Sequence, residues 1–178
     1  MNTAEKLSKR TISLHWLIAV GMIGSLFFGI YVEDLPKSPE AGQLIGLHKS
    51  IGLLVLTFAL LRIANTFATG LPSPLTPATQ WQLTLAKGIH MLLLAGTILM
   101  PISGMIMSVG GGHSVAFFGI ELIAKMPKNE LMGQIGHVIH GLGGNIILAA
   151  IAIHVAGALK HSLFVKDETM SRMLGKSI

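Results

Sequence analysis

The stretch that decides the fold is Gln134–Leu159, QIGHVIHGLGGNIILAAIAIHVAGAL, which contains no Asp, Glu, Lys or Arg. Its length suits one membrane-spanning helix, which needs about 20 mainly apolar residues. Open strands are not viable in lipid, because every backbone N–H and C=O must be satisfied internally, so the stretch is predicted to be helical. It carries His140 and His154. Ionisable side chains inside a membrane are expensive and therefore indicate function.

The spacing of these two histidines predicts where their side chains lie. His140 and His154 are 14 residues apart, and at about 100° and 1.5 Å per residue this is roughly 40° short of four full turns, with a rise of about 21 Å. Both imidazoles are therefore expected on one face of the helix, one near each membrane surface. His137 is the alternative for the outer position, although its offset from His154 places it about 100° off the common face.

Three further apolar segments of membrane-spanning length precede this one, at about 12–31, 47–67 and 88–109. Together with 134–159 they predict an all-α protein, an integral membrane four-helix bundle. We expect a single domain over residues 1–178. Residues 166–178 are expected to form a short polar tail. The connectors are rich in turn-forming residues, among them the Pro-rich stretch at 69–77 and three glycines at 110–112 that are predicted to end the third helix.

The distribution of basic residues predicts the orientation. Nine Lys and Arg residues fall on one side of the predicted spans and four on the other. The larger group is Lys6, Lys9, Arg10, Arg62, Lys87, Lys160, Lys166, Arg172 and Lys176, and the smaller is Lys37, Lys49, Lys125 and Lys128. Because cytoplasmic loops carry an excess of Lys and Arg, both termini are predicted to be cytoplasmic.

The composition excludes several classes of protein. The chain is 51% hydrophobic and 12% charged, with a mean hydropathy of +0.68, whereas soluble domains have roughly 25% charged residues. This disfavours a soluble enzyme, and it also excludes disorder. The absence of cysteine excludes disulfides, thiolate zinc sites, iron–sulfur clusters and a cysteine nucleophile. The net charge of +5 does not point to nucleic acid, because the basic residues lie between apolar runs, where membrane topology explains them.

Two further histidines match the first two in depth. His15 lies near the inner end of the first segment and His48 at the outer end of the second. We therefore expect His15 beside His154 and His48 beside His140, because bundle cofactor sites are built from inward-facing side chains. Without Cys, Asp or Glu at these levels a tetrahedral zinc site lacks ligands.

Haem iron needs only two axial ligands from the protein, because the porphyrin supplies the other four. The four histidines therefore predict two bis-histidine haems of b type, since the chain has no C-x-x-C-H motif for covalent attachment. Filled axial positions favour electron transfer over oxygen binding. A histidine-lined proton or metal-ion transporter is the alternative from another functional class.

The order of several short motifs resembles the prokaryotic cytochrome b561 family, which includes superoxide oxidase. The resemblance covers about residues 8–174. The motifs are Ser13-Leu-His-Trp16, Leu47-His-Lys-Ser50, Pro101-Ile-Ser-Gly104, Phe117-Phe-Gly119, Val138-Ile-His140 and Ile153-His-Val-Ala-Gly-Ala-Leu-Lys-His161. The sequence departs from the family pattern in carrying His137 beside His140, and Lys160-His161-Ser162 where two adjacent histidines often appear.

The resemblance implies a four-helix protein of the bacterial inner membrane with two b haems, whose axial ligands fall on His15, His48, His140 and His154. Members pass electrons between a quinone and another donor or acceptor. In superoxide oxidase-like members, superoxide is oxidised at the periplasmic face and ubiquinone is reduced near the cytoplasmic haem. The expected function is therefore superoxide oxidation outside with quinone reduction inside. The alternative is quinol oxidation that passes electrons to a periplasmic acceptor.

Four other residues are candidates for secondary roles. Lys49 follows an expected ligand at the outer surface, where a cation attracts small anions such as superoxide; a snorkelling interfacial lysine is the structural alternative. His161 lies seven residues past His154, about 20° away on the same face, where it can contact a quinone head group or solvent. His90 and Arg62 lie at the inner end, and each is a candidate for the quinone side or for supporting a haem.

Overall fold

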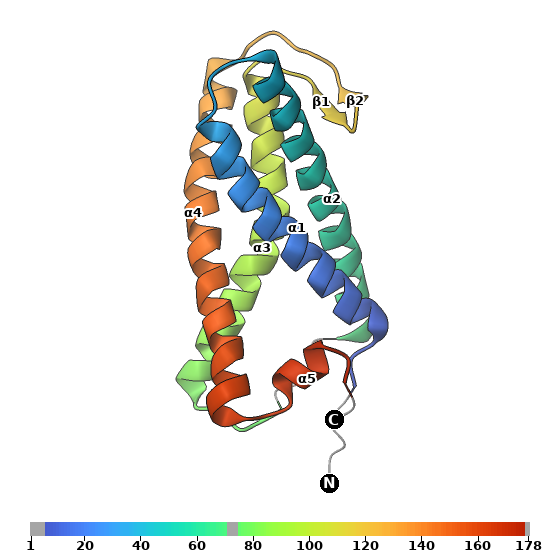
Figure 1. The fold of residues 1–178 in the computed structure, drawn as a ribbon, viewed down its shortest axis with the longest axis vertical. Helices are drawn as coiled ribbons and strands as arrows, with labels where there is room; N and C mark the ends of the chain where they lie inside the picture. The colour runs from blue at the N-terminus through green and yellow to red at the C-terminus, as the bar shows by residue number, and fades with distance from the viewer. Residues whose placement is uncertain (1–5, 71–74, 177–178) are drawn as a thin grey trace.

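The computed structural model describes residues 6–70 and 75–176, and over these residues the protein is mostly helical. Four helices are long and apolar enough to cross a membrane. They are α1 (Lys9–Glu33), α2 (Pro39–Thr69), α3 (Gln80–Gly110) and α4 (Glu130–Lys160). They run up and down along one axis (Figure 1). The sequence-based expectation of an all-α membrane four-helix bundle is confirmed.

The helices extend beyond the apolar segments that predicted them. The start of α2 is at Pro39 rather than about residue 47, and α3 starts at Gln80 rather than about residue 88. The extra turns mix polar and apolar residues, and they begin at side chains that cap them. Ser38 accepts a hydrogen bond from the backbone of Ala41, and Thr79 forms a capping box with Gln82. Hydropathy detects the part of a helix that suits lipid, whereas capping decides where the helix begins.

The helices pack through small residues and one central cluster. Met22, Val55, Met100 and Ile147, one from each helix, form the buried cluster. Where α3 ends and α4 begins, the two helices come so close that a Cβ on Gly136 would collide with the backbone of Met107. Membrane helices associate through such small-residue contacts because lipid gives no hydrophobic drive between them. Small residues fill the contacts between helices, and many large apolar side chains face outward, where they suit a lipid environment.

The connector after α3 contains a β-hairpin, and neither of its strands was predicted from the sequence. Strand β1 (Val115–Phe117) pairs antiparallel with β2 (Ile120–Ile123), and the pair lies beside α2 (Figure 1). Its turn places Phe118 and Gly119 at φ 46° and 90°, which two-residue hairpin turns require. The hydroxyl of Ser50 on α2 accepts a hydrogen bond of 3.0 Å from the backbone N–H of Phe118. This contact anchors the hairpin to a residue far away in the sequence.

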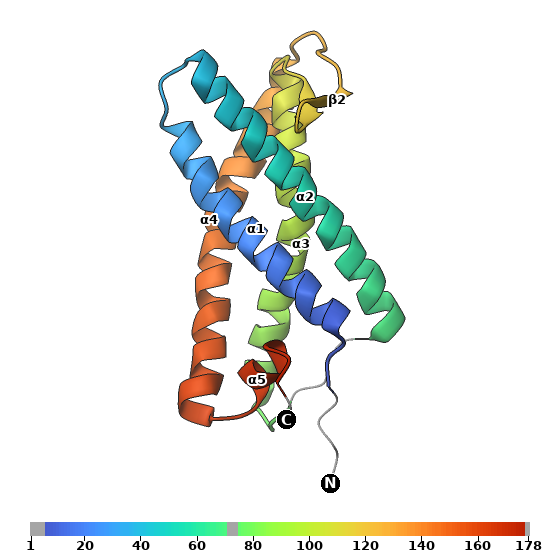
Figure 2. The ribbon, with the colours of Figure 1, turned by 45° about the vertical axis from the view of Figure 1, so that its right-hand side comes forward.

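The C-terminal segment, of which residues 166–178 are predicted to be a short polar tail, contains helical structure over its described residues. A π-helical turn, η1 (His161–Val165), continues α4, and Lys166 then adopts a left-handed conformation. The short helix α5 (Thr169–Met173) follows and crosses beneath the bundle toward α1 (Figure 2). There the indole Nε1 of Trp16 donates a 2.9 Å hydrogen bond to the carbonyl of Met173. Part of the Pro-rich stretch expected at 69–77 lies outside the described residues.

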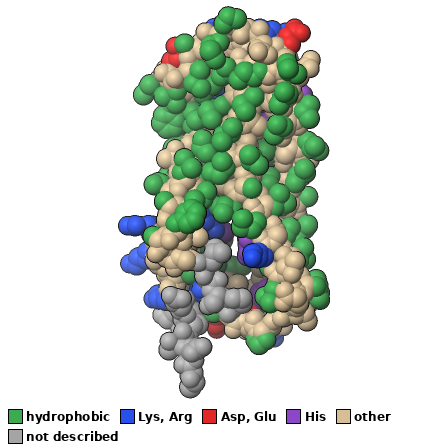
Figure 3. Space-filling model, turned by 180° about the vertical axis from the view of Figure 1, so that it is seen from behind, with side chains coloured by type: hydrophobic (Ala, Val, Ile, Leu, Met, Phe, Trp, Pro, Cys, Tyr) green, Lys and Arg blue, Asp and Glu red, His purple; other side chains and the backbone are tan. Residues whose placement is uncertain are grey.

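Charged side chains gather at the two ends of the bundle. In Figure 3 Lys and Arg side chains collect around the end where α1 begins, and acidic side chains appear at the opposite end. The long sides between them are largely apolar. This separation is what the excess of Lys and Arg on one side predicts. We call the end where α1 begins and α5 lies the inner end and the opposite one the outer end. That the inner end is cytoplasmic stays a prediction.

Candidate functional site

The outer half of the bundle holds one pair of facing histidines. His48 on α2 and His140 on α4 have ring centres 6.2 Å apart, with ring planes at 88°. A glycine from a neighbouring helix packs behind each ring. A Cβ on Gly29 would lie 3.0 Å from Cε1 of His48, and one on Gly104 would lie 3.0 Å from Cε1 of His140. Glycine at these two positions therefore leaves room for the rings in their observed orientation.

The hydrogen bonds of His140 define which ring nitrogen carries its proton. Nδ1 lies 3.0 Å from the backbone carbonyl of Met100 and 3.1 Å from the hydroxyl of Ser103. A carbonyl only accepts, so Nδ1–H is the donor and the lone pair of the neutral ring is on Nε2. Metal-ligating histidines usually hold their other ring N–H in this way. For His48 the corresponding Nδ1 atom is 3.4 Å from the hydroxyl of Ser25.

The inner half of the bundle holds the second pair. His15 on α1 and His154 on α4 have ring centres 6.2 Å apart, with planes at 62°. His90 on α3 joins them, its ring centre 5.2 Å from that of His154. The surface is hollowed in this half of the molecule, and histidine side chains are visible inside the hollow (Figure 3). The structure therefore places His15 beside His154 and His48 beside His140, as their depths and helical spacing predicted.

Arg62 gives the inner pair a different hydrogen-bonding state. Its Nη1 atom lies 2.9 Å from Nδ1 of His15. A guanidinium only donates, so Nδ1 is the acceptor and the proton of the neutral ring is on Nε2. This is opposite to the arrangement at His140. Before Nε2 of His15 can bind a metal, the ring has to move this proton to Nδ1, and Arg62 has to donate elsewhere.

Both pairs have the dimensions of two axial ligands on one metal. With a metal–nitrogen bond of about 2.0 Å and roughly 1.2 Å from each nitrogen to its ring centre, two such imidazoles have ring centres about 6.4 Å apart. Within residues 6–70 and 75–176, no three His, Cys, Asp or Glu side chains are grouped so as to hold a metal ion by themselves. Two-histidine sites fit a metal that brings its remaining ligands, as haem iron does.

Lys49 lies at the outer end, where it ties α2 to α3 and to the loop before the hairpin. Its ammonium donates to the hydroxyl of Ser108 at 2.6 Å and to the carbonyl of Ser114 at 3.1 Å. An ammonium has three donors, so one remains for a further acceptor. The described part of the chain shows no carboxylate within salt-bridge distance of it. The side chain is half-buried rather than freely solvated.

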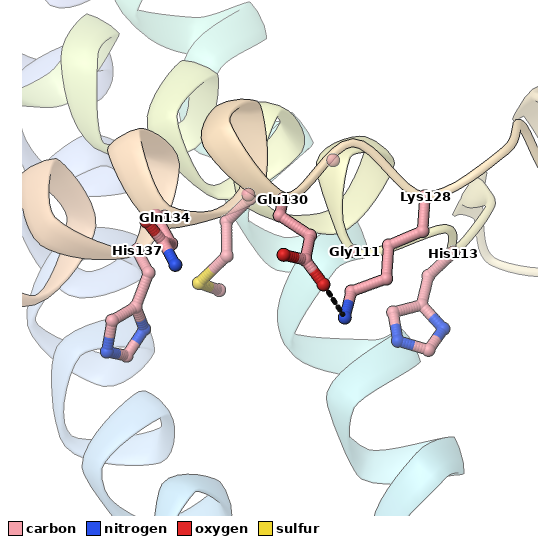
Figure 4. Close-up of a pocket in the computed structure, with 9 residues that line it drawn as sticks. Gly111, His113, Lys128, Glu130, Gln134 and His137 are labelled. Carbon is pink, nitrogen blue, oxygen red and sulfur yellow. Dashed lines mark hydrogen bonds and ion pairs between the residues drawn. The ribbon is translucent and has the colours of Figure 1, made fainter.

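His137 lines a separate surface pocket. This pocket, of about 420 Å³, lies between the end of α3 and the start of α4. His137 and Gln134 line one side and His113 the other, with an ion pair of 3.2 Å between Lys128 and Glu130 across the middle (Figure 4). Both histidines are exposed. The structure therefore places His140, and not His137, against His48.

His161 lies at the inner end, where α4 passes into the π-helical turn. Its Nδ1 atom is 2.6 Å from Oδ2 of Asp167. The sequence pointed to His161 as a candidate site residue, but it did not point to Asp167. It also missed Ser103 and Met100, which contact His140. The spacing of six between His161 and Asp167 fits no helix face, because a π-turn and a left-handed Lys166 separate them; the sequence carried no periodic signal for this contact.

Comparison with known proteins identifies relatives along nearly the whole chain. A family model described as prokaryotic cytochrome b561 matches residues 6–176. Cytochrome b561 homolog 2 from Escherichia coli (strain K12) is 28% identical over 99% of this chain and 95% of its own length. Cytochrome b561 homolog 1 from the same strain is 27% identical over 96% and 97%. A probable superoxide oxidase from Yersinia pestis is 24% identical over 97% of both chains.

Proposed function

The chain belongs to the prokaryotic cytochrome b561 family, and from this premise we propose that it carries electrons between superoxide at the outer face and a quinone at the inner face. The family implies a multi-pass bacterial membrane protein that binds haem b and transfers electrons across the membrane. Our proposal adds the number of haems, their ligands and the two substrates. It also places the protein in the inner membrane with its outer end in the periplasm.

The observation that carries the proposal is the repetition of one geometry at two depths. Each half of the bundle has two histidines with ring centres 6.2 Å apart, and α4 supplies one member of each pair. We assign His48 and His140 to an outer haem and His15 and His154 to an inner one. The haems supply reversible one-electron chemistry. The helices supply the axial nitrogens, the spacing of about 21 Å along α4 and an apolar surrounding.

At the outer end we assign Lys49 the role of attracting superoxide. Its ammonium is held by two neutral acceptors, Ser108 and Ser114, so these contacts do not cancel its positive charge. A fixed cation raises the local concentration of a small anion. Two superoxide ions each lose one electron and become oxygen, and one quinone takes up these two electrons and two protons to become quinol.

At the inner end we assign three side chains to quinone binding and haem support. His161 is half-exposed, with 37% of its side chain accessible, so it can contact a quinone from the membrane interface. His90 packs edge-on against His154 and so supports the orientation of that ring. Arg62 has to release Nδ1 of His15 when that ring binds iron, and an anionic haem propionate is a suitable new acceptor for a guanidinium.

The first test measures haem content and electron entry in the purified full-length protein. We expect a reduced-minus-oxidised spectrum of b type and two haems per chain by the pyridine haemochrome assay. In stopped-flow mixing, superoxide should reduce the haems rapidly, and a short-chain ubiquinone should reoxidise them. One haem per chain, or a colourless protein, would remove the proposed electron path.

The same experiment separates the alternatives. If the physiological direction is quinol oxidation toward a periplasmic acceptor, ubiquinol should reduce the haems rapidly and superoxide only slowly. A histidine-lined transporter would instead show no haem band at all.

The substitution Lys49→Gln tests the outer site. We expect slower haem reduction by superoxide, with a weaker dependence on salt than in the wild type, because removing the cation reduces electrostatic steering of the anion.

A further inference from the structure

Asp167 lies between η1 and α5, and its side chain is only 6% exposed. Its Oδ2 atom is 2.6 Å from Nδ1 of His161 and accepts a 3.0 Å hydrogen bond from the hydroxyl of Thr76. Its Oδ1 atom accepts a 3.0 Å hydrogen bond from the backbone N–H of Thr169. The carboxylate therefore joins three segments of the inner end: the end of α4, the connector before α3 and the start of α5.

These contacts fix the charge of Asp167. Partial burial raises its pKa, but hydrogen bonds from Thr169, His161 and Thr76 outweigh this effect and lower the pKa to about 2. The group is therefore ionised at neutral pH, and an ionised carboxylate only accepts hydrogen bonds. It follows that Nδ1 of His161 is the donor and carries a proton. The other charged side chains of these segments are Lys160, Lys166, Glu168 and Arg172.

The surrounding fold holds this pair in place. The left-handed Lys166 turns the chain back, and its N–H donates to the carbonyl of His161, which brings Asp167 beside the ring. Beyond Asp167, Trp16 on α1 holds α5 through the carbonyl of Met173. A π-turn inside a helical segment is frequent at functional sites. Here the turn begins at His161, and Asp167 follows its end by two residues.

We propose that Asp167 is a positioning residue for the quinone reaction, because it holds the Nδ1 proton of His161 and so leaves Nε2 as the atom that exchanges a proton with the quinone oxygen. This inference rests on the proposed function, in which His161 contacts the quinone. It adds Asp167 and the tautomer of His161 to that proposal. Asp167 itself acts through His161 and does not touch the quinone.

A quinone that becomes quinol takes two electrons, which originate from superoxide, and two protons. One proton leaves Nε2 of the doubly protonated His161, so that an N–H bond breaks and an O–H bond forms on the quinone. The neutral ring stays bonded to Asp167 through Nδ1–H. Water at the inner surface returns this proton to Nε2 and supplies the second proton of the quinol.

The test compares Asp167→Asn with Thr76→Val in the haem-loaded full-length protein. The amide of Asn can donate to Nδ1 and move the ring proton to Nε2, whereas Thr76→Val removes one hydrogen bond to the same oxygen and leaves the carboxylate in place. Histidine is labelled with ¹⁵N, and His161→Gln assigns the His161 signals. We expect a proton on Nδ1 in the wild type and in Thr76→Val, and on Nε2 in the neutral ring of Asp167→Asn.

Kinetics provide the second readout. Pre-reduced protein is mixed with a short-chain ubiquinone, and the reoxidation of the haem bands is followed. Asp167→Asn should slow this step by roughly 10²-fold, the lower range for loss of general acid–base catalysis, while haem reduction by superoxide and the haem spectrum stay unchanged. Thr76→Val should remain within a few-fold of the wild type.

The outcomes separate this inference from the proposed function. If the wild type itself is not reoxidised by the quinone, the proposed function fails. If the wild type is reoxidised but Asp167→Asn reacts at the same rate, or if wild-type Nδ1 carries no proton, the positioning role of Asp167 is wrong. If Asp167→Asn loses haem or slows superoxide oxidation equally, its effect is structural, and the inference is likewise overturned.

Discussion

At the residue scale, the position of His140 opposite His48 leads to a prediction about haem binding. His140→Ala should lose one haem per chain and keep the other, because His15 and His154 do not depend on it for their geometry. His137→Ala should keep both, since its side chain lies in the outer surface pocket. Haem content and the shape of the reduced α-band in purified protein measure both effects. Loss of haem in His137→Ala with retention in His140→Ala would transfer the outer ligand to His137.

The same scale shows what one sequence can and cannot predict. His140 and His154 were predictable because a regular helix converts a spacing of 14 residues into a common face. The proton on Nδ1 of His140 was not, because it depends on a carbonyl of α3, 40 residues away in the chain. The contact from Arg62 to His15 was also not predictable, because a basic residue near a helix end is by itself only a topology signal.

At the element scale, two glycines on α4 offer a matched pair of substitutions. Gly136→Ala places a Cβ into the backbone of Met107, whereas nothing lies within 4 Å of the same atom on Gly141. We expect Gly136→Ala to destabilise the protein by about 1–3 kcal/mol, as overpacking does. Gly141→Ala should be neutral or slightly stabilising, because alanine is the better helix former by up to about 1 kcal/mol. Thermal unfolding in detergent, followed by circular dichroism, compares them.

This comparison also tests how the α3–α4 contact supports the outer histidine pair. His140 is four residues after Gly136, and its hydrogen bonds go to α3. If α3 and α4 are forced apart, the outer haem band should broaden before the inner one changes. Equal melting temperatures for the two alanine variants would show that α3 and α4 can separate at little cost in free energy. Their close approach would then not explain why position 136 is a glycine.

Elements outside the long helices were the least predictable part of the fold. Four apolar segments predicted four helices, because lipid requires internally satisfied backbones and leaves few other structures. The β-hairpin and α5 are not subject to that constraint. They depend on contacts between residues far apart in the sequence, such as those from Ser50 to Phe118 and from Trp16 to Met173. Such contacts cannot be predicted from a short segment that has no strong periodicity.

At the scale of the whole molecule, the separation of charge predicts the orientation in the membrane. Lys37 lies in the outer connector, and Lys176 follows α5 at the inner end. The chain contains no cysteine, so Lys37→Cys and Lys176→Cys each introduce a single thiol, and each removes one positive charge. In intact cells a maleimide that does not cross the inner membrane should label Lys37→Cys and not Lys176→Cys. After permeabilisation both should be labelled.

The direction of electron flow depends on this result. With Lys49 on the periplasmic side, superoxide generated outside the cytoplasm meets the outer haem, and His161 with Asp167 draws protons from the cytoplasm. With the opposite labelling pattern, the same residues would face the opposite compartments. The excess of Lys and Arg would then lie outside, although cytoplasmic loops normally carry that excess. Labelling of Lys176→Cys in intact cells would therefore overturn the assigned sides while leaving the two histidine pairs in place.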